Sequence, residues 1–496
     1  MTPLPPGLAL VLDPSVRVHE GGVLVGGAPR RALRLSAAGA RALAALERGG
    51  ADGDAAGALG RTLTDAGMAH PSPEPRPAAG DVTVVVPVRD RAAQLDRCLA
   101  ALEPGTPVVV VDDGSRDGAA VAAVAARHGT RVVRRDAAGG PAAARNAALR
   151  SIDTELVAFL DSDCVPDPAW LRALVGHFDD PLVAAVAPRV RPLSAPRRGA
   201  VCGYLAARSP LDMGPRAARV APGLPVSYVP TAALVVRRDA LAGGFDEGLR
   251  YGEDVDLVWR LHERGRRVRY DPRVVVAHDE PVAVRRVLAR RWRYGTSAAP
   301  LAARHPGRLA HAVLGPWPAL AVALVLARRP GAAALVAAQH SVVLGERAHR
   351  LGLPRSLGPR WFARGAASAG LSMSRYVATF ALPVAVAAAL RRRRPLGLAL
   401  LALPALEEWW RRRPDLGPVR WTALSLADDA AYGLGVWWGS ARARTLAPLV
   451  PDVGAGRRNA GSSRRARAAP LASSRARRSR APDPAACPLT CVKRMH

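Results

Sequence analysis

Residues 108–118 read VVVVDDGSRDG, and this stretch decides the fold that we expect for the chain. Its valines form a β-branched run that is too apolar for a solvent-facing strand but suits a strand buried on both faces of a parallel sheet. The run ends in Asp112 and Asp113, followed by the turn residues Gly114 and Ser115. Because ligands of open α/β sheets bind beyond the carboxyl ends of the strands, we expect a ligand site here.

The same pattern occurs twice more in this part of the chain. Residues 156–163, LVAFLDSD, form a second apolar run with acidic residues at its end, and residues 82–88 form a third. Segments with helical character and short connections separate the runs. This alternation predicts an α/β domain with a doubly wound parallel sheet, which we place at residues 81–300.

The acidic end of the second run has the spacing of a metal site. Asp161 and Asp163 flank Ser162, and alternate residues of an extended segment point to the same side. Both carboxylates can therefore face one divalent ion, and Mg²⁺ or Mn²⁺ would keep further positions for phosphate oxygens. A solvated strand end is the alternative.

The composition is strongly basic, with a formal net charge of +30, and Lys493 is the only lysine. The excess is therefore almost all arginine, which together with frequent Ala, Gly and Pro is typical of a GC-rich genome. Aromatic residues make up 4% of the chain, too few for base-stacking platforms, so we expect no nucleic acid partner. An anionic membrane surface is an equally good partner for the basic second half.

The chain divides into five expected parts. They are a small α+β module at residues 1–70, a Pro-rich linker at 71–80, the α/β domain at 81–300, an apolar helical region at 301–450 and a disordered basic tail at 451–496. The cysteines lack zinc-site spacing, and the start lacks the pattern of a signal peptide, so we expect a reduced, cytosolic setting.

The apolar helical region has the character of an interfacial segment. Residues 312–327 are uncharged, but a spanning helix needs about 20 apolar residues. Tryptophan and arginine flank the apolar runs, as is usual at a membrane interface. We expect partly inserted helices at the cytoplasmic face of the membrane. Spanning helices and a soluble helical domain are the alternatives.

Seven motifs resemble the family-2 inverting glycosyltransferases of GT-A fold. In chain order they are VVVPVRDR (84–91), VVVVDDGSRDG (108–118), GGPAAARNAAL (139–149), AFLDSDCVPDPAWL (158–171), PTAALVVRRDAL (230–241), GGFDE (243–247) and GEDVDLVWRL (252–261). The resemblance covers about residues 82–300. It implies a Rossmann-like domain that binds a UDP-sugar donor with a divalent metal, Mg or Mn.

The resemblance also implies roles for individual residues. The donor nucleotide side would consist of Pro87, Arg89, Asp90, Asp113, Arg145 and Asp161. The metal side would consist of Asp163 as principal ligand, Asp161 and His278. Thr231 would line the acceptor pocket, and Arg290, Arg291, Trp292 and Arg293 would close over the diphosphate. For the aspartates the alternative is turn formation or capping, for His278 a structural role, and for the arginines a basic helix near a membrane.

Asp254 is the expected catalytic base. It lies at a predicted helix start, where the macrodipole favours a carboxylate, and it can take the proton from an attacking hydroxyl. One base without a second carboxylate nucleophile implies a single displacement with inversion. Glu253 beside it is expected to orient the acceptor or the loop. Ordinary first-turn acids are the alternative for both.

Over its whole length the chain is similar to the glycosyltransferases of mycofactocin biosynthesis. SYVPTAALVVRRDAL (227–241), LRYGEDVDLVWRL (249–261), the N-terminal module and the apolar C-terminal part carry this resemblance. It implies transfer of glucose from UDP-glucose to a peptide-derived redox cofactor precursor, with repeated β-1,4 additions as a further expectation. A lipid or envelope polysaccharide acceptor is the alternative. A non-catalytic basic binding module is a third, against which the intact set of acids argues.

The first 70 residues resemble the peptide-binding winged-helix modules of ribosomal-peptide maturation pathways. The pattern VLDPSVRVHEGG (11–22), with RLSAAG and ALAAL after it, carries this resemblance. Such a module would hold a precursor peptide as an added edge strand. A folding appendage is the alternative.

Overall fold

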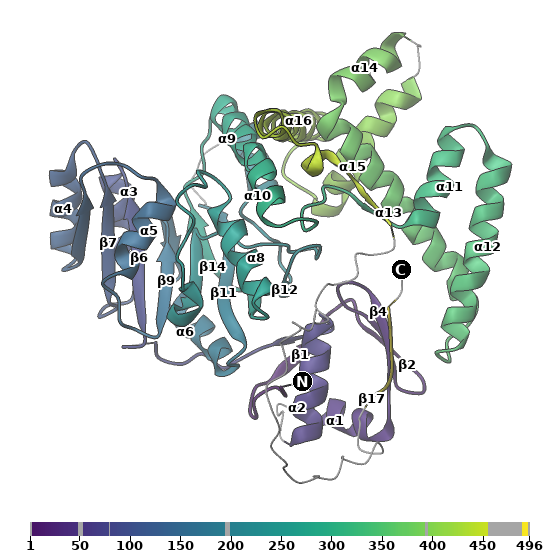
Figure 1. Ribbon diagram of the computed structural model, residues 1–496, viewed down its shortest axis with the longest axis horizontal. Coiled ribbons are helices and arrows are strands. Elements are labelled where there is room, and N and C mark those ends of the chain that lie inside the picture. The colour runs from purple at the N-terminus through teal and green to yellow at the C-terminus, as the bar shows by residue number, and fades with distance from the viewer. Residues whose placement is uncertain are drawn as a thin grey trace, which may run out of the picture.

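A nine-stranded mixed sheet forms the centre of the computed structural model (Figure 1), which describes residues 2–47, 53–78, 80–193, 199–391, 395–454 and 489–494. The strand order is β10-β14-β11-β13-β9-β6-β7-β8, with β12 paired to β14. The strands are β6 (Val82–Val88), β7 (Val108–Asp113), β8 (Arg131–Arg135), β9 (Leu156–Leu160), β10 (Cys164–Pro166), β11 (Val183–Pro192), β12 (Ala218–Val220), β13 (Ala233–Arg237) and β14 (Arg267–His278). The predicted α/β fold is confirmed.

The sheet is parallel only in part. Strands β9, β6, β7 and β8 pair in parallel, as the apolar runs predicted. Strand β13, however, runs antiparallel to both β9 and β11, and β10 and β12 run antiparallel to β14, so the predicted parallel sheet is a mixed one. The reason is that a continuous apolar run shows that a strand is buried on both faces but carries no information about its direction.

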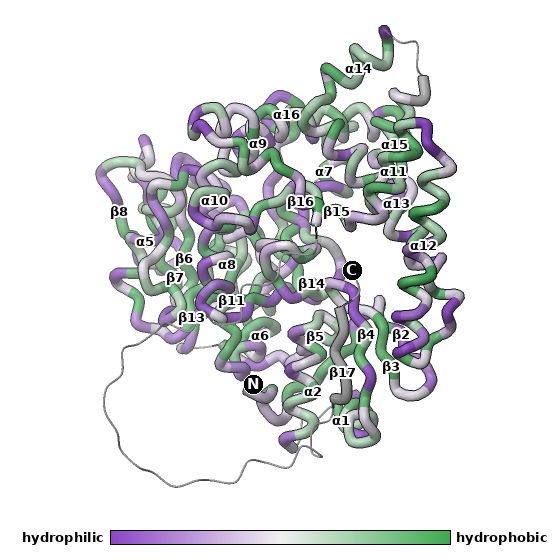
Figure 2. The backbone as a smooth tube through the Cα atoms, turned by 45° about the vertical axis from the view of Figure 1, so that its right-hand side comes forward, coloured by the Kyte–Doolittle hydropathy of each residue, from purple (hydrophilic) through white to green (hydrophobic). Residues whose placement is uncertain are grey.

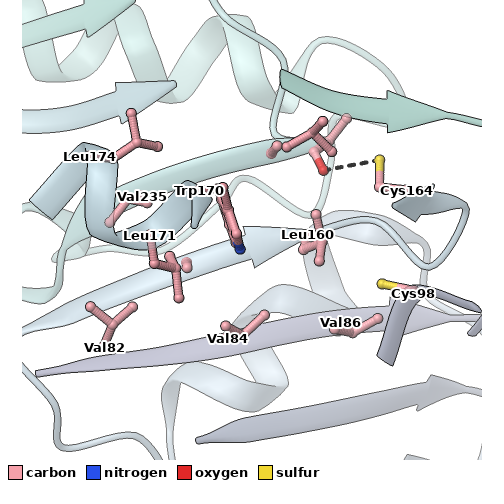
Figure 3. Close-up of a cluster of buried hydrophobic side chains, with 14 of the residues drawn as sticks. Val82, Val84, Val86, Cys98, Leu160, Cys164, Trp170, Leu171, Leu174 and Val235 are labelled. Carbon is pink, nitrogen blue, oxygen red and sulfur yellow. Dashed lines mark hydrogen bonds between the residues drawn. The ribbon is translucent and has the colours of Figure 1, made fainter. Parts of the chain in front are cut away.

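Helices cover both faces of the sheet. One core contains Val84 and Val86 of β6 and packs against α3 (Ala92–Ala100), α4 (Gly118–Arg127) and α6 (Trp170–Val175). Figure 3 shows Val82, Val84 and Val86 in a row on the side of Trp170 and Leu171. Val85 belongs to the opposite core, which includes α5 (Pro141–Leu149) and α8 (Glu253–Glu263). Each such buried valine stabilises the fold by roughly 1.5–3 kcal/mol.

The N-terminal unit is a small α+β structure. Its elements are β1 (Leu10–Leu12), β2 (Arg17–His19), β3 (Val23–Gly26), β4 (Arg31–Leu35), α1 (Ala37–Glu47), α2 (Asp54–Asp65) and β5 (Ala69–Pro71). A four-stranded sheet has the order β17-β4-β3-β2, and its outermost strand, β17 (Leu489–Arg494), comes from the end of the chain.

Two strands lie in the part of the chain that was expected to be a disordered tail. Residues 451–496 were predicted to be disordered, which is wrong for β16 (Asp452–Val453) and for β17. Strand β16 pairs with β15 (Val313–Leu314), and β17 pairs with β4. Edge strands pair through main-chain hydrogen bonds and need no apolar pattern. The composition of the tail therefore did not indicate these two strands. The remaining boundaries of the five parts stay predictions.

Two interfaces hold the N-terminal unit in place. On the side of the central sheet, Arg61 and Asp180 form a fully buried ion pair with an Nη1–Oδ2 distance of 2.6 Å. Nearby, the Arg267 guanidinium donates to both carboxylate oxygens of Asp65, at 2.7 and 2.6 Å. On the other side, side chains of β3 and β4 form a buried cluster with residues of the C-terminal helices: Val23, Val25, Ala32, Ala348, Leu351 and Leu353.

The rest of the described chain is mostly helical. Its helices are α7 (Ala200–Arg208), α9 (Val284–Thr296), α10 (Ala298–Arg304), α11 (Pro316–Leu326), α12 (Pro330–His349), α13 (Leu357–Phe380), α14 (Leu382–Arg391), α15 (Pro395–Arg412) and α16 (Pro418–Arg442). Figure 2 shows long hydrophobic stretches along α11–α16. Within the described ranges, no single helix has the length and apolar character for crossing a membrane, and only α13 with α14, bent by 101°, passes as a pair.

Glycines allow α9 and α16 to pack backbone against backbone. A Cβ added at Gly295 would lie 2.2 Å from the Tyr432 carbonyl oxygen, and one at Gly435 would lie 2.0 Å from the Trp292 carbonyl oxygen.

We predict that Gly295→Ala lowers the free energy of unfolding by about 1–3 kcal/mol, because the helices must separate. The urea unfolding midpoint measures this change. Gly370→Ala on α13 is the matched control, because nothing lies within 4 Å of its added Cβ, and an equal loss there would contradict the prediction.

Candidate active site

A cavity of about 1440 Å³ lies at the carboxyl ends of the parallel strands. Acidic residues from distant parts of the sequence line it: Asp113, Asp161, Asp163 and Asp254. Pro87, Arg89, Arg145, Thr231, Glu253, His278 and Arg291 also line it. Of the acids expected to share the site, Asp90 is absent from the lining, although its neighbours Arg89 and Arg91 are present.

Asp90 and Asp113 organise the loops at the donor end. Asp90 has a φ of 56°, a left-handed conformation that aspartate adopts more readily than most residues. Its carboxylate accepts a hydrogen bond from the Arg116 amide at 2.7 Å. Asp113 accepts from the amides of Gly139 and Gly140, at 3.0 and 2.8 Å, and pairs with Arg135. Asp113 therefore fixes the glycine loop that precedes α5.

Arg145 on α5 joins the two acidic ends of the site. Its guanidinium, 2% exposed, donates to Asp161 Oδ1 at 2.8 Å and to Glu253 Oε1 at 3.0 Å. It also lies over the Phe245 ring, 5.4 Å from the centroid. Its predicted place on the donor nucleotide side stays a prediction, and both of its terminal nitrogens bind carboxylates in this structure. Arg145 therefore links Asp161 to Glu253 and positions both carboxylates.

Asp163 and His278 face each other across the cavity wall. His278 Nε2 lies 3.5 Å from Asp163 Oδ1, and its Nδ1 lies 3.6 Å from Glu280 Oε1. Burial disfavours the charged imidazole, but Glu280 and Asp163 outweigh this effect and raise the pKa of His278. A histidine with a carboxylate behind it is a frequent arrangement at metal sites. Asp163 also pairs with Arg91, and no group of three or more His, Cys, Asp or Glu side chains is assembled for a metal in the described ranges.

Asp254 occupies the first turn of α8. The turn is preceded by Gly252 in the left-handed conformation, with a φ of 85°. Enclosure by the protein disfavours the carboxylate, and the neighbouring charge of Glu253 adds to the effect, so the pKa of Asp254 is raised to about 7. A carboxyl group with this pKa can accept a proton near neutral pH, which is the property of a general base.

Tyrosines and Trp259 line the same cavity as Asp254. Tyr228, Tyr294 and Tyr432 line the cavity, and burial raises the pKa of Tyr294 to about 12. The Trp259 indole donates to the Ser227 carbonyl at 2.9 Å, which holds the segment before Thr231. Thr231 is buried in this wall, and its role at an acceptor stays a prediction.

The four residues of α9 that were expected to close over the diphosphate point to different surroundings. Arg290 pairs with Glu280 at 2.5 Å, and Arg291 pairs with Asp428 of α16 at 2.9 Å. Arg293 and Trp292 are exposed and do not line the cavity. Of these four residues, Arg291 alone lines the cavity, and their closure over a diphosphate stays a prediction.

The matching family model is that of glycosyl transferase family 2, over residues 83–239. The pre-mycofactocin glycosyltransferase of Mycobacterium tuberculosis is 40% identical over 469 residues, which is 91% of this chain and 99% of that relative. The chain belongs to the pre-mycofactocin glycosyltransferase family. The glycosyltransferase AglE of Haloferax volcanii is more distant, with 27% identity over 40% of this chain and 66% of its own length.

The chain is thus a family-2 glycosyltransferase. A mannosyltransferase from Pyrobaculum calidifontis, solved with GDP-mannose and Mn²⁺, matches with a TM-score of 0.41 and 21% identity, over 74% of this chain and 89% of that one. The glucosyl-3-phosphoglycerate synthase of Mycobacterium tuberculosis, solved with Mn²⁺ and UDP, matches with a TM-score of 0.32 over 45% of this chain and 79% of that one.

Sequence reasoning missed several residues that line the cavity. Tyr228 lies in the motif that contains Thr231, so its position in SYVPT was an available signal. Tyr432 of α16 and Arg31 of β4 gave no such signal. They come from helical and N-terminal parts of this pre-mycofactocin glycosyltransferase family member, and only the tertiary fold brings them to the site.

Proposed function

We propose that the protein is an inverting glycosyltransferase that transfers glucose from UDP-glucose to a peptide-derived precursor of mycofactocin. The convergence of Asp113, Asp161, Asp163 and Asp254 on one cavity carries this proposal. The name of the 40% identical relative supports the acceptor, since that protein is a pre-mycofactocin glycosyltransferase. Repeated transfer to give a short β-1,4-glucan is part of the proposal.

In the proposed reaction, the acceptor hydroxyl oxygen attacks the anomeric carbon of the donor in a single displacement. Asp254 takes the hydroxyl proton as the new bond forms, and the diphosphate leaves from the opposite side. Arg145 keeps Asp161 and Glu253 in place through its two hydrogen bonds. The absence of a covalent intermediate means that the configuration at the anomeric carbon inverts.

We propose that the reaction needs Mg²⁺ or Mn²⁺, with Asp163 as the principal ligand, and that Asp161 and His278 join it only when the ion binds, because the described side chains are not assembled for a metal in this structure. Carboxylate oxygens and an imidazole nitrogen are suitable ligands for these ions, and all three residues line the cavity. Glu280 behind His278 would fix the ring orientation. The bound ion would neutralise charge on the departing diphosphate.

The test is UDP release from UDP-glucose by the purified protein, with and without Mn²⁺. We expect release with the metal, and a β-linked product when the maturing precursor is added. No release or transfer with any sugar nucleotide would remove the proposal. Mass spectrometry of the matured product, from cells with and without the protein, tests the acceptor, and an unchanged mass would exclude the peptide-derived one.

The rate should depend on pH through Asp254. Its protonated form cannot accept the hydroxyl proton, so kcat/KM should rise about tenfold per pH unit below pH 7 and level off above it, in line with a pKa of about 7. A pH–rate profile with saturating metal measures this. A profile that is flat between pH 5 and 8 would contradict the role of Asp254.

We propose that the protein works at the cytoplasmic face of the membrane, in contact with the lipid surface. Large apolar side chains are exposed on the C-terminal helices: Trp317, Leu326, Leu335, Val342, Val384, Leu390, Trp410, Leu434 and Trp438. Arginines lie beside several of these helices and would complement anionic lipids. This surface also favours a second candidate acceptor, a lipid or envelope polysaccharide.

Vesicle sedimentation tests the membrane contact. We expect the protein to sediment with phosphatidylglycerol-containing vesicles, and we expect the double variant Leu335→Asp with Val384→Asp to lose much of this binding, because both side chains are more than two-thirds exposed, at 73% and 72%. Val18→Asp is the matched control, since Val18 is 60% exposed on the N-terminal unit. Equal binding by all three proteins would contradict the proposal.

A further inference from the structure

A histidine and a tyrosine from the C-terminal half of the chain form a hydrogen-bonded pair in the cavity wall. His311 precedes β15 and Tyr432 lies on α16, and both residues line the same cavity as Asp254. The Tyr432 hydroxyl lies 2.9 Å from His311 Nε2, and His311 Nδ1 lies 2.7 Å from the Pro448 carbonyl oxygen. Neither side chain has a part in the proposed reaction or belongs to one of the seven motifs.

The surroundings of His311 determine which of its ring nitrogens carries the proton. A carbonyl oxygen can only accept a hydrogen bond, so Nδ1, which faces Pro448, must be the N–H donor. Burial lowers the pKa of His311, so the ring is neutral near pH 7 and its Nε2 carries no proton. Nε2 therefore accepts, and the Tyr432 O–H donates to it. The hydroxyl hydrogen of Tyr432 is thus already used, while its oxygen can still accept a hydrogen bond.

The Tyr432 oxygen lies near the catalytic base and has room for a second partner. Among the residues that the structure describes, His311 is the only hydrogen-bond partner of this hydroxyl. Burial and the charge of Asp254 raise the pKa of Tyr228, and Tyr432 acts on the same phenol. Asp254 and Tyr432 are therefore both within electrostatic range of Tyr228, which also lines the cavity. A ligand that lies between them meets two groups that accept hydrogen bonds.

We infer that Tyr432 binds a hydroxyl group of a sugar acceptor, and that His311 is the positioning residue that keeps the Tyr432 oxygen as the accepting partner. Neighbouring hydroxyl groups of a sugar ring match this arrangement, because one can react at Asp254 while another donates to Tyr432. The inference rests on the proposed function and deepens it. In repeated transfer the glucose that was added last is the next acceptor, so the site must also recognise a sugar.

The backbone holds both members of the pair in place. The Asp452 amide donates to the Ala312 carbonyl at 2.8 Å, and this contact joins β16 to the segment of the histidine. On α16, a Cβ added at Gly433 would lie 1.8 Å from the Thr379 carbonyl oxygen, so α13 packs closely beside Tyr432. The accepting oxygen is therefore positioned before the acceptor binds, which lowers the entropy cost of binding.

Nitrogen NMR of the full chain tests the pair itself. With ¹⁵N-labelled histidine, we expect one ring with a protonated Nδ1 and an unprotonated Nε2 near neutral pH, and we expect its signals to be missing in His311→Gln. In Tyr432→Phe the Nε2 signal of this ring should shift, because the nitrogen loses its donor. A His311 ring that is protonated at Nε2, or an Nε2 signal that Tyr432→Phe leaves unchanged, would overturn the inference.

Tyr432→Phe tests the acceptor contact, with methyl β-cellobioside as the acceptor and UDP-glucose as the donor. We expect the KM for the cellobioside to rise about tenfold, as for one lost hydrogen bond, with little change in kcat or in the affinity for UDP. Tyr376→Phe is the matched control, because the Tyr376 hydroxyl donates to the Leu449 carbonyl and the residue is outside the cavity lining. An unchanged KM in Tyr432→Phe, or an equal rise in the control, would overturn the inference.

Variants of His311 test whether it acts through Tyr432. His311→Leu should raise the KM as much as Tyr432→Phe does, and the double variant should be no worse than either single one. His311→Gln should keep most of the wild-type affinity, because its side-chain oxygen can accept from the Tyr432 hydroxyl. Additive effects of the two substitutions, or equal losses in the leucine and glutamine variants, would show that His311 has a merely structural role.

Deoxy acceptors identify the donating hydroxyl group. Among monodeoxy methyl β-cellobiosides that keep the reacting hydroxyl, we expect one to lose about tenfold in kcat/KM with wild type and nothing further with Tyr432→Phe. Equal ratios in both proteins for every analogue would overturn the contact. A wild type that transfers glucose to the maturing precursor but to no cellobioside would overturn the sugar acceptor. UDP release by wild type without any added acceptor reports on the proposed function separately, and the NMR result does not depend on it.

Discussion

Replacing Asp254 by asparagine is expected to lower kcat by about 10²–10⁴-fold while UDP binding stays intact. The amide has nearly the shape of the carboxyl group but cannot accept the hydroxyl proton. Asp254 is placed for this role by the first turn of α8, and its pKa of about 7 makes it basic enough at neutral pH. Steady-state rates of UDP release and titration calorimetry with UDP measure the two quantities.

The melting temperature of the Asp254→Asn variant distinguishes a loss of catalysis from damage to the fold. The folded-state pKa of Asp254 is raised above its unfolded value, so its charged form costs stability as pH rises from about 4 to 7. The asparagine variant should therefore melt no lower than wild type at pH 8. Asp256→Asn is the matched control on the same helix, because Asp256 binds Arg260 and His305 instead of facing the cavity. A larger rate loss in the control would show that Asp254 is not the base.

Asp163→Ala is expected to abolish measurable turnover, with a loss of at least about 10²-fold, and to remove the metal dependence of UDP binding. Asp163 is the residue on which Arg91 and His278 converge at the cavity wall, so its removal takes away the central proposed ligand. Calorimetry with UDP, in the presence and absence of Mn²⁺, measures the binding, and a radiometric transfer assay measures the turnover.

The contrast between these two variants assigns the roles. Asp163→Ala should impair binding and turnover together, whereas Asp254→Asn should impair turnover alone. Asp167→Ala is a suitable control for the first, because Asp167 only accepts a hydrogen bond from the Ala169 amide at an exposed turn. Metal-dependent UDP binding that survives in Asp163→Ala would mean that Asp161 and His278 suffice, or that the ion is bound elsewhere.

The sequence predicted those parts of the fold that local patterns determine. The valine run before Asp113 and the apolar run before Asp161 are buried strands, because β-branched and apolar residues at consecutive positions fit a sheet covered on both faces. A helix begins at Glu253, in agreement with the helix start predicted at Asp254. The acids at the strand ends meet at one cavity because parallel strands end on the same edge.

The rest could not be predicted because it depends on contacts between distant segments. The direction of β13 is set by the path of the chain before it. The half-exposed position of Asp90 follows from a left-handed turn that no motif specifies. The ion pairs of Arg145 were not predicted either: its buried guanidinium needs counter-charges, and Asp161 and Glu253 supply them. The pairing of β17 with β4 joins the two ends of the chain.

The charged contacts between α16 and the catalytic region limit how the protein can be divided or recombined. Asp428 pairs with Arg291 of α9, and Asp429 pairs with Arg208 of α7, both at sites with little solvent access. A fragment that ends near residue 300 would keep both arginines but lose both aspartates and the surface of α16 that packs on α9. Chimeric enzymes made from this scaffold should therefore exchange α7, α9 and α16 as a single block.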